Sequence, residues 1–222
     1  MCIYYLPITS TNWNQTDNQL LKYVSPQRQK RISKFVFDVD KKLTLYSGLI
    51  IRWALSNMSE IPVADLRFYS EPNQKPHLLP ISSLDFSISH TRNAILCCLS
   101  STARVGADIE KIADAPFEIM KHAFHFEEIK YVENAPVSNA DYRFYEIWTR
   151  KEAYTKSIGT GLSEKLSAIN TLASDFTPNF RTWQEDSYMC SVFSEKPFEQ
   201  ISFTTLSENF IAKFYLPDYN SP

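Results

Sequence analysis

Two carboxylates stand two residues apart in the segment 105–110, at Asp108 and Glu110. The segment reads as a β-strand, in which side chains alternate between faces, so we expect both carboxylates on one face and Ala107 and Ile109 on the other. Two anions this close repel one another unless a cation lies between them. Oxygen ligands of this kind suit Mg²⁺ bound together with a substrate phosphate. The pattern indicates either a magnesium site or, as the plainer alternative, a strand edge that faces water.

A second candidate lies in the segment 148–156, which reads as a helix. Trp148, Glu152 and Lys156 recur every four residues and therefore stack along one helical face. The plain interpretation is a surface Glu–Lys pair beside a buried tryptophan. A carboxylate and an ammonium flanked by a large aromatic ring are also typical of a functional site.

Histidine and basic side chains provide candidate anion ligands. His90 ends a predicted strand, with Phe86 and Ile88 on the same face, and a histidine at a strand end can donate to an anionic group. Arginine and lysine groups can bind phosphates but more often form a solvated face. The basic candidates are Arg28, Arg31, Lys34 and Lys75, the last of which precedes Pro76.

Several common sites are excluded or disfavoured by their motifs. Glu118, His122 and His125 share one helical face, but their spacing departs from that of a helical zinc site, and we do not expect one. The chain contains no nucleophile-elbow, P-loop or dinucleotide-binding motif. With only 4 glycines, a glycine-rich phosphate loop is not expected.

The elements that must position these residues alternate between helices and strands. Ser25 and Pro26 read as the N-cap and first residue of a helix. Periodicity predicts further helices over 41–56, 117–132 and 142–158. It predicts strands over 2–6, 84–89, 94–100, 104–110, 189–194, 200–206 and 209–216.

Each half of the chain thus reads as two helices followed by three strands. We therefore predict an α+β fold of two similar lobes related by a pseudo-twofold axis, each a small antiparallel sheet packed with helices. The expected lobes are residues 1–103 and 104–222, with the active site in the cleft between them.

Composition limits the partners and the compartment. The 222 residues include 23 Lys and Arg against 25 Asp and Glu, a net charge of -2, whereas duplex-DNA binders usually carry a basic excess. The four cysteines lack zinc spacing and indicate buried thiols in a reducing compartment. Residues 1–7 do not read as a signal peptide, and no apolar stretch approaches about 20 residues. We expect a cytoplasmic protein with no nucleic-acid or membrane partner.

Read together, the motifs resemble the two-lobed, Sfp-like branch of the 4′-phosphopantetheinyl transferases. The resemblance spans nearly the whole chain, and its motifs occur in the family's order. The matching residues are Lys75-Pro76, Phe86-Ser87-Ile88-Ser89-His90, Gly106-Ala107-Asp108-Ile109-Glu110, Trp148-Thr149-Arg150-Lys151-Glu152-Ala153-Tyr154-Thr155-Lys156 and Gly159-Thr160-Gly161-Leu162.

The resemblance implies an enzyme that moves phosphopantetheine from coenzyme A to a serine of an apo carrier protein and releases adenosine 3′,5′-bisphosphate. By similarity, Asp108, Glu110 and Glu152 would bind Mg²⁺, and Lys156 would contact the pyrophosphate of coenzyme A. His90 and Arg31 would hold the 3′-phosphate, with Arg28 close by. The nucleotide site would also be lined by Thr44, Lys75, Pro76 and Ser89.

The chemistry leaves some roles open. The serine hydroxyl needs a base, and Glu152, Glu128 or a water molecule are all candidates. The resemblance implies acyl, peptidyl or polyketide carriers as partners, with residues 161–166 and the segment near Phe124 as a candidate carrier rim. We expect a monomer, because both lobes belong to one chain. Two alternatives are a binding module for coenzyme A or carrier that lacks activity, and a Mg²⁺-dependent phosphodiesterase.

Overall fold

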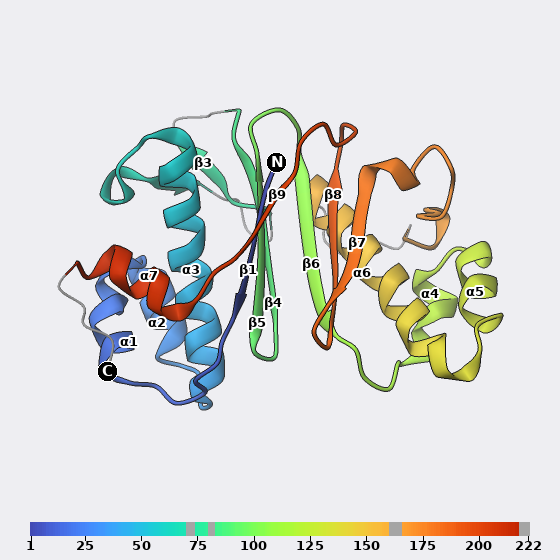
Figure 1. The fold of residues 1–222 in the computed structure, drawn as a ribbon, viewed down its shortest axis with the longest axis horizontal. Coiled ribbons are helices and arrows are strands. Elements are labelled where there is room, and N and C mark those ends of the chain that lie inside the picture. Colours follow the sequence, from blue (N-terminus) through green and yellow to red (C-terminus); the bar gives the residue numbers. More distant parts are fainter. Residues whose placement is uncertain (70–73, 80–82, 160–165, 218–222) are drawn as a thin grey trace.

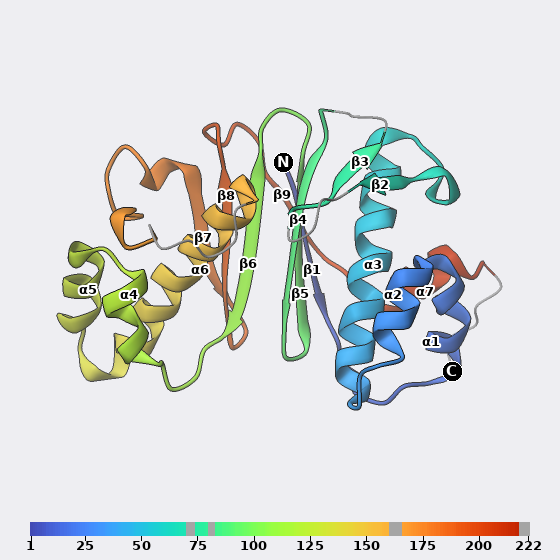
Figure 2. The ribbon, with the colours of Figure 1, turned by 180° about the vertical axis from the view of Figure 1, so that it is seen from behind.

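Two β-sheets face each other in the middle of the molecule, and helices cover their outer faces (Figures 1 and 2). The computed structural model describes residues 1–69, 74–79, 83–159 and 166–217. Apolar side chains from the facing strands form the core between the sheets, among them Ile3, Leu96, Ala107 and Val192. The layers therefore run helix, sheet, sheet, helix, which confirms the predicted α+β fold of two lobes.

The first lobe contains a four-stranded sheet in the order β4-β5-β1-β9. Its outer face packs against the long helix α3 (Asp38–Ser59), whose apolar positions are buried on almost every side. The lobe consists of β1 (Cys2–Pro7), α1 (Gln15–Leu20), α2 (Pro26–Ile32), α3, β2 (Arg67–Tyr69), β3 (His77–Leu79), β4 (Asp85–Thr91) and β5 (Ala94–Ser100), with β9 (Ser202–Thr205) and α7 (Glu208–Tyr215) from the end of the chain.

The second lobe contains a three-stranded antiparallel sheet in the order β6-β8-β7. Helix α6 (Ala140–Ile158) covers its outer face and ends at Gly159, which adopts the left-handed conformation (φ 75°) that glycine accepts without strain. The other elements are β6 (Val105–Lys111), α4 (Met120–Ala123), α5 (Phe126–Glu133), β7 (Phe180–Glu185) and β8 (Tyr188–Ser194). Within the described residues, no helix combines the length and apolar character needed to cross a bilayer.

Several predicted elements are correct and others are not. Ser25 caps α2 with Pro26 in its first turn, as predicted. The helix predicted over 117–132 is broken, because His125 is extended and caps a new helix, α5. The three successive strands predicted over 84–110 exist but do not share one sheet, since β4 and β5 form a hairpin and β6 joins the other sheet.

The C-terminal segment departs furthest from the prediction. The strand expected over 200–206 exists as β9, but it pairs in parallel with β1 of the first lobe. The strand expected over 209–216 is wrong: this segment is the helix α7, which Ser207 caps and which buries Ile211 and Tyr215 in the core of the first lobe. The predicted boundary at 103/104 lies in the β5–β6 turn, and the chain beyond it contributes β9 and α7 to the first lobe.

Candidate active site

The two lobes meet along β4 and β6, which lie side by side and run in the same direction. Alternate side chains of β4 bond to the backbone of β6: Asp85 Oδ2 accepts from Val105 N (2.7 Å), and Ser87 Oγ accepts from Ala107 N (3.0 Å). Between these positions, Phe86 belongs to the core of the first lobe and Ile88 packs against it. Side chains rather than a backbone ladder therefore set the register between the two sheets.

The next two side chains of the same series bond to the predicted acidic pair. Ser89 Oγ donates to Asp108 Oδ1 (2.9 Å), and Thr91 Oγ1 donates to Glu110 Oε2 (3.1 Å). Asp108 and Glu110 thus lie away from the core between the sheets, which receives Ala107. The predicted alternation of faces on this strand is confirmed, and the solvent-facing edge is excluded for Asp108, which is 2% exposed.

Helix α6 brings a third contact to this point. Lys156 Nζ lies 2.5 Å from Asp108 Oδ1 and donates to Ser89 Oγ (2.8 Å). The helix approaches β6 this closely because of Gly106: a Cβ atom there would lie 1.7 Å from the carbonyl oxygen of Ala153. Three elements from both lobes, β4, β6 and α6, therefore meet at one buried carboxylate.

Glu152 lies close enough to these carboxylates for their charges to interact. Burial, and next the charge of Asp108, raise the pKa of Glu152 and bring the pKa of Glu110 to about 7. Asp108 Oδ2 and Glu152 Oε1 are buried and have no hydrogen-bond partner among the described residues. Mutual repulsion and orphaned oxygens both fit a bound cation.

The acidic side chains do not by themselves form a ready-made metal site. Among the described residues, no set of three or more histidine, cysteine, aspartate or glutamate side chains converges on one point. The positive charge next to Asp108 is instead the ammonium group of Lys156. The carboxylate oxygens of Asp108, Glu110 and Glu152 are suitable ligands for a divalent ion. Their side chains would have to move to bind the same ion.

A cationic group lies at the end of β4. Although His90 keeps exposed surface, partial desolvation of its ring lowers the pKa of the imidazole, and the positive charges of Arg31, Lys156 and Arg28 lower it further, so these cations lie near it. Arg28 Nη1 donates to the carbonyl oxygen of buried Thr44 (3.0 Å), which fixes the guanidinium over α3. Cations held this close together favour an anionic ligand.

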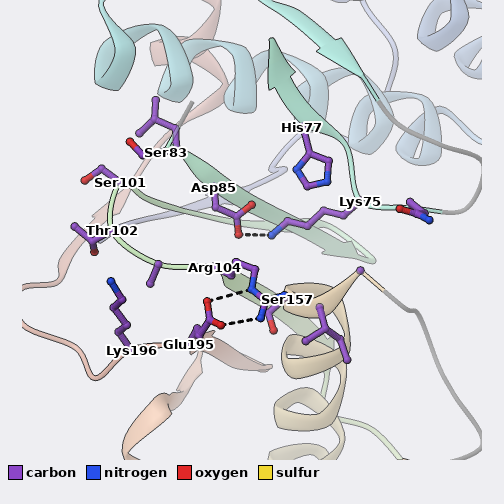
Figure 3. Close-up of a pocket in the computed structure, with 15 residues that line it drawn as sticks. Lys75, His77, Ser83, Asp85, Ser101, Thr102, Arg104, Ser157, Glu195 and Lys196 are labelled. Atoms are coloured by element: carbon purple, nitrogen blue, oxygen red, sulfur yellow. Dashed lines mark hydrogen bonds and ion pairs between the residues drawn. The ribbon is translucent and has the colours of Figure 1, made fainter. Parts of the chain in front are cut away.

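Two adjoining cavities extend the cleft along α6. The smaller, of about 250 Å³, is lined by Lys75, Pro76 and Lys156 and by residues of β4. The larger, of about 570 Å³, shares Lys75 with it and contains the ion pairs Lys75–Asp85 and Arg104–Glu195 (Figure 3). Lys75 Nζ also donates to Val105 O (2.7 Å), so this predicted nucleotide ligand joins the lobes as well.

Glu128 does not belong to this cluster. The side chain is 0% exposed, and its two oxygens accept from Thr171 N and Oγ1 and from His125 N. Lys151 Nζ completes the set at 2.8 Å. With both oxygens occupied inside the second lobe, Glu128 is not placed to receive a proton from a substrate, and this argues against the predicted role as base.

The predicted carrier rim is covered only in part. Residues 161–165 lie outside the described residues, and Leu166 is buried. Phe124 is also buried and packs against the ring of Phe144 with centroids 5.2 Å apart, whereas Phe126 beside it is 58% exposed. Phe124 is therefore a core residue, and the exposed ring of that segment is Phe126.

Sequence reasoning missed Asp85 and Thr91, which contact the same strand as Ser87 and Ser89. The signal was present: a run of polar side chains at every second position, 85, 87, 89 and 91, in a strand with apolar alternate positions. Such a run predicts a polar seam against a neighbouring strand. Gly106 was part of a matched motif, but its close contact with α6 requires knowledge of the packing.

Comparison with known proteins identifies the family. The profile described as the 4′-phosphopantetheinyl transferase superfamily matches residues 104–214, half of the chain, and a profile described as 4′-phosphopantetheinyl transferase, N-terminal, matches residues 11–102.

Individual relatives agree with the profiles. The chain is 28% identical to the 4′-phosphopantetheinyl transferase psf-1 of Bacillus pumilus, over 76% of this chain and 72% of the relative. It is 26% identical to the 4′-phosphopantetheinyl transferase Sfp of Bacillus subtilis (strain 168), over 77% and 75%. It is 29% identical to the L-aminoadipate-semialdehyde dehydrogenase-phosphopantetheinyl transferase of Mus musculus, over 67% and 52%. The chain therefore belongs to the 4′-phosphopantetheinyl transferase superfamily, in its Sfp-like branch.

Proposed function

We propose that the protein transfers 4′-phosphopantetheine from coenzyme A to a serine of an apo carrier protein in a Mg²⁺-dependent reaction. The observation that carries this proposal is the meeting of Lys156, Asp108 and Ser89 from three elements, next to Glu152 and Glu110. Carboxylates beside a lysine suit a metal-bound pyrophosphate, and the nearby cations suit a further phosphate.

Each group has a proposed role. Asp108, Glu110 and Glu152 would hold Mg²⁺, which when bound neutralises charge on the pyrophosphate. Lys156 would contact the same pyrophosphate. The 3′-phosphate and the nucleotide would be held by Arg28, Arg31, His90, Thr44, Lys75, Pro76 and Ser89.

The transfer exchanges one phosphorus–oxygen bond for another. The serine oxygen of the carrier bonds to the pantetheine-bearing phosphorus, the bond from this phosphorus to the bridging oxygen breaks, and adenosine 3′,5′-bisphosphate leaves. The serine proton passes to a base, for which Glu152 or a water molecule beside it is the remaining candidate. Glu152 Oε1 has no hydrogen-bond partner among the described residues, so it can accept from the serine or from that water molecule. Because one carboxylate is not both a tight metal ligand and a strong base, the two proposed roles of Glu152 compete.

The same proposal covers partners and setting. Coenzyme A and an apo carrier of fatty-acid, polyketide or nonribosomal-peptide synthesis would be the two substrates. No nucleic acid or membrane is needed, and we propose that a cytoplasmic monomer suffices, since both lobes contribute to the cleft within one chain.

A direct experiment is to incubate the protein, coenzyme A and Mg²⁺ with a panel of apo carriers and to measure carrier mass. We expect pantetheinylation of at least one carrier, loss of the product with a chelator, and a rate at least about 100-fold lower for Asp108→Asn. Asp65→Asn, an exposed change in the first lobe, is the matched control. No conversion of any carrier, or full activity of Asp108→Asn, would contradict the proposal.

A second candidate is a binding module for coenzyme A that does not need a metal. It is favoured by the ion pair of Lys156 with Asp108, which neutralises this carboxylate with a protein cation. Calorimetric titration of coenzyme A with Mg²⁺ and with a chelator separates the two functions. Equal affinity in both, with no product on any carrier, would support the binding module.

A further inference from the structure

A buried chain of hydroxyl groups lies behind the acidic cluster, and the proposed reaction does not use it. Ser191 of β8 stands opposite Asp108 in the β6–β8 ladder, so the two side chains lie on the same face of the sheet. Its Oγ lies 2.8 Å from Thr149 Oγ1 of α6 and 2.9 Å from Thr182 Oγ1 of β7. Thr149 and Ser191 are both 0% exposed.

The two ends of this hydroxyl chain fix its direction. Arg150 Nε donates to Thr182 Oγ1 (3.0 Å), and Thr149 Oγ1 donates to the carbonyl oxygen of Tyr145 (2.8 Å). The hydroxyl of Thr182 then donates to Ser191, and that of Ser191 donates to Thr149. Every hydroxyl in the chain both donates and accepts, so loss of the Ser191 hydroxyl breaks two bonds and leaves the Thr182 donor without its acceptor.

The chain attaches α6 to the sheet close to the acidic cluster. Thr149 lies three residues before Glu152 and seven before Lys156, spacings that share one helical face. A further close contact on this face is the approach of Ala153 to Gly106. A close packed contact limits how near the helix comes to the sheet, but a directed hydrogen bond also limits its rotation about its own axis.

We propose that Ser191 is a positioning residue: through Thr149, its hydroxyl holds α6 in the rotation that brings Glu152 towards Asp108. The inference rests on the proposed function, because it takes Asp108 and Glu152 as ligands of one divalent ion. A hydroxyl chain that only stabilised the second lobe would change the unfolding temperature but not the affinity of the folded protein for that ion.

Binding of Mn²⁺ tests this inference without any transfer. Free Mn²⁺ is followed by electron paramagnetic resonance in a titration of the full chain with coenzyme A and no carrier. We expect Ser191→Ala and Thr149→Val each to weaken Mn²⁺ binding by about tenfold, a loss typical of residues that orient metal ligands. Thr149→Ser keeps the hydroxyl and should remain within about twofold of the original protein.

The control variant is Ser56→Ala, which removes a bond to the carbonyl oxygen of Ile61 (2.7 Å) in the first lobe. It should lower the unfolding temperature and leave Mn²⁺ affinity unchanged. Unchanged affinity in folded Ser191→Ala and Thr149→Val would overturn the inference alone, whereas an original protein that binds no Mn²⁺ would overturn the proposed function with it. If Ser191→Ala does not fold, the Mn²⁺ affinities of Thr149→Val and Thr149→Ser are compared, and equal affinities would overturn the inference.

Discussion

At the residue scale, Lys156 forms an ion pair with Asp108, a proposed ligand of the divalent ion, and it is also the proposed contact of the pyrophosphate. Its ammonium group bonds to Asp108 Oδ1, while Asp108 Oδ2 and Glu152 Oε1 have no partner among the described residues. An ammonium and a divalent cation beside the same carboxylate repel one another, so the lysine opposes metal binding until an anion draws it away.

Lys156→Met should therefore have opposite effects on the two ligands. We expect Mn²⁺ to bind the protein several-fold more tightly in the absence of coenzyme A, because the competing charge is gone, and coenzyme A to bind more weakly. Both affinities can be measured by calorimetry, with Lys121→Met, an exposed lysine, as control. Mn²⁺ affinity that is unchanged or lower in the folded variant would contradict this view of Lys156.

His90 should make coenzyme A binding depend on pH. Partial desolvation of the ring and the nearby positive charges lower its pKa below the usual value, so the imidazole is mainly neutral at neutral pH. A bound phosphate favours the protonated form, and coenzyme A should therefore bind more tightly as the pH falls through the region between the two pKa values. The charged groups that face the imidazole are Arg28 and Arg31 of α2, Asp40 of α3 and Lys156 of α6.

The measurement is the dissociation constant of coenzyme A from about pH 8 to about pH 6, a range that spans the titration of histidine. The phosphates of the ligand titrate there too, so His90→Gln provides the reference, and the original protein should show the steeper dependence. His122→Gln, at an exposed position, should behave like the original protein. Identical slopes for the original protein and His90→Gln would remove His90 from phosphate binding.

At the element scale, the contact between α6 and β6 leaves no room for a side chain at Gly106. A Cβ at Gly106 would meet the backbone carbonyl of Ala153, which cannot rotate away, so Gly106→Ala must displace the helix. We expect a loss of about 3 kcal/mol in the free energy of unfolding and a marked loss of transfer activity. Urea denaturation and the carrier assay measure the two effects.

Gly48 offers a matched control on α3. A Cβ there would lie 2.6 Å from Arg28 Cδ and 3.0 Å from Val24 Cγ1, which are side-chain atoms rather than backbone, and the arginine can give way by breaking its bond to Thr44 O. Gly48→Ala should change stability little, since alanine also favours the helix. Because it displaces Arg28, it should weaken coenzyme A binding instead. Equal destabilisation by Gly106→Ala and Gly48→Ala would contradict the view that the contact of α6 with β6 cannot accommodate a side chain.

The helices and strands differ in how well the sequence predicted them. Alternation and helical spacing correctly predicted the acidic face of β6, the long helix α3 and the stacked residues of α6. They failed where a short pattern fits both a strand and a helix. Residues 208–215 are apolar enough for a strand, and the packing of Ile211 and Tyr215 on the first lobe favours the helix. The pairing of β9 with β1 joins residues about 200 positions apart, and no local pattern encodes it.

The same limit applies to the site. The residue types and order indicated Asp108, Glu152 and Lys156, because carboxylates and amines at strand and helix spacing imply a shared face. They did not reveal that Glu128 is occupied by Lys151 and Thr171, since these partners come from a helix and a loop elsewhere in the chain. Long-range side-chain pairs of this kind become visible only once the packing is known.

At the scale of the whole molecule, the first lobe depends on the end of the chain. Tyr215 is buried and donates to Leu49 O (2.8 Å), and Glu208 forms an ion pair with the buried Lys42 (2.7 Å). Tyr215→Ala should lower the free energy of unfolding by about 3 kcal/mol or more through the cavity and the lost bond. Chemical denaturation provides the measurement.

The neighbouring ring gives the control for this prediction. Phe214 is 42% exposed, so Phe214→Ala should change the free energy of unfolding by about 1 kcal/mol or less. Similar losses for the two substitutions would contradict the dependence of the first lobe on the docking of α7.

The polar seam along β4 has a consequence for recombining relatives of this protein. Because Asp85, Ser87, Ser89 and Thr91 align the second sheet through their side chains, an exchange of whole halves between two parents would mismatch donors and acceptors at the junction. A working hybrid should therefore need β4 and β6 from the same parent, although β4 belongs to the first lobe and β6 to the second. The crossover between parents should fall outside the segment that contains both strands.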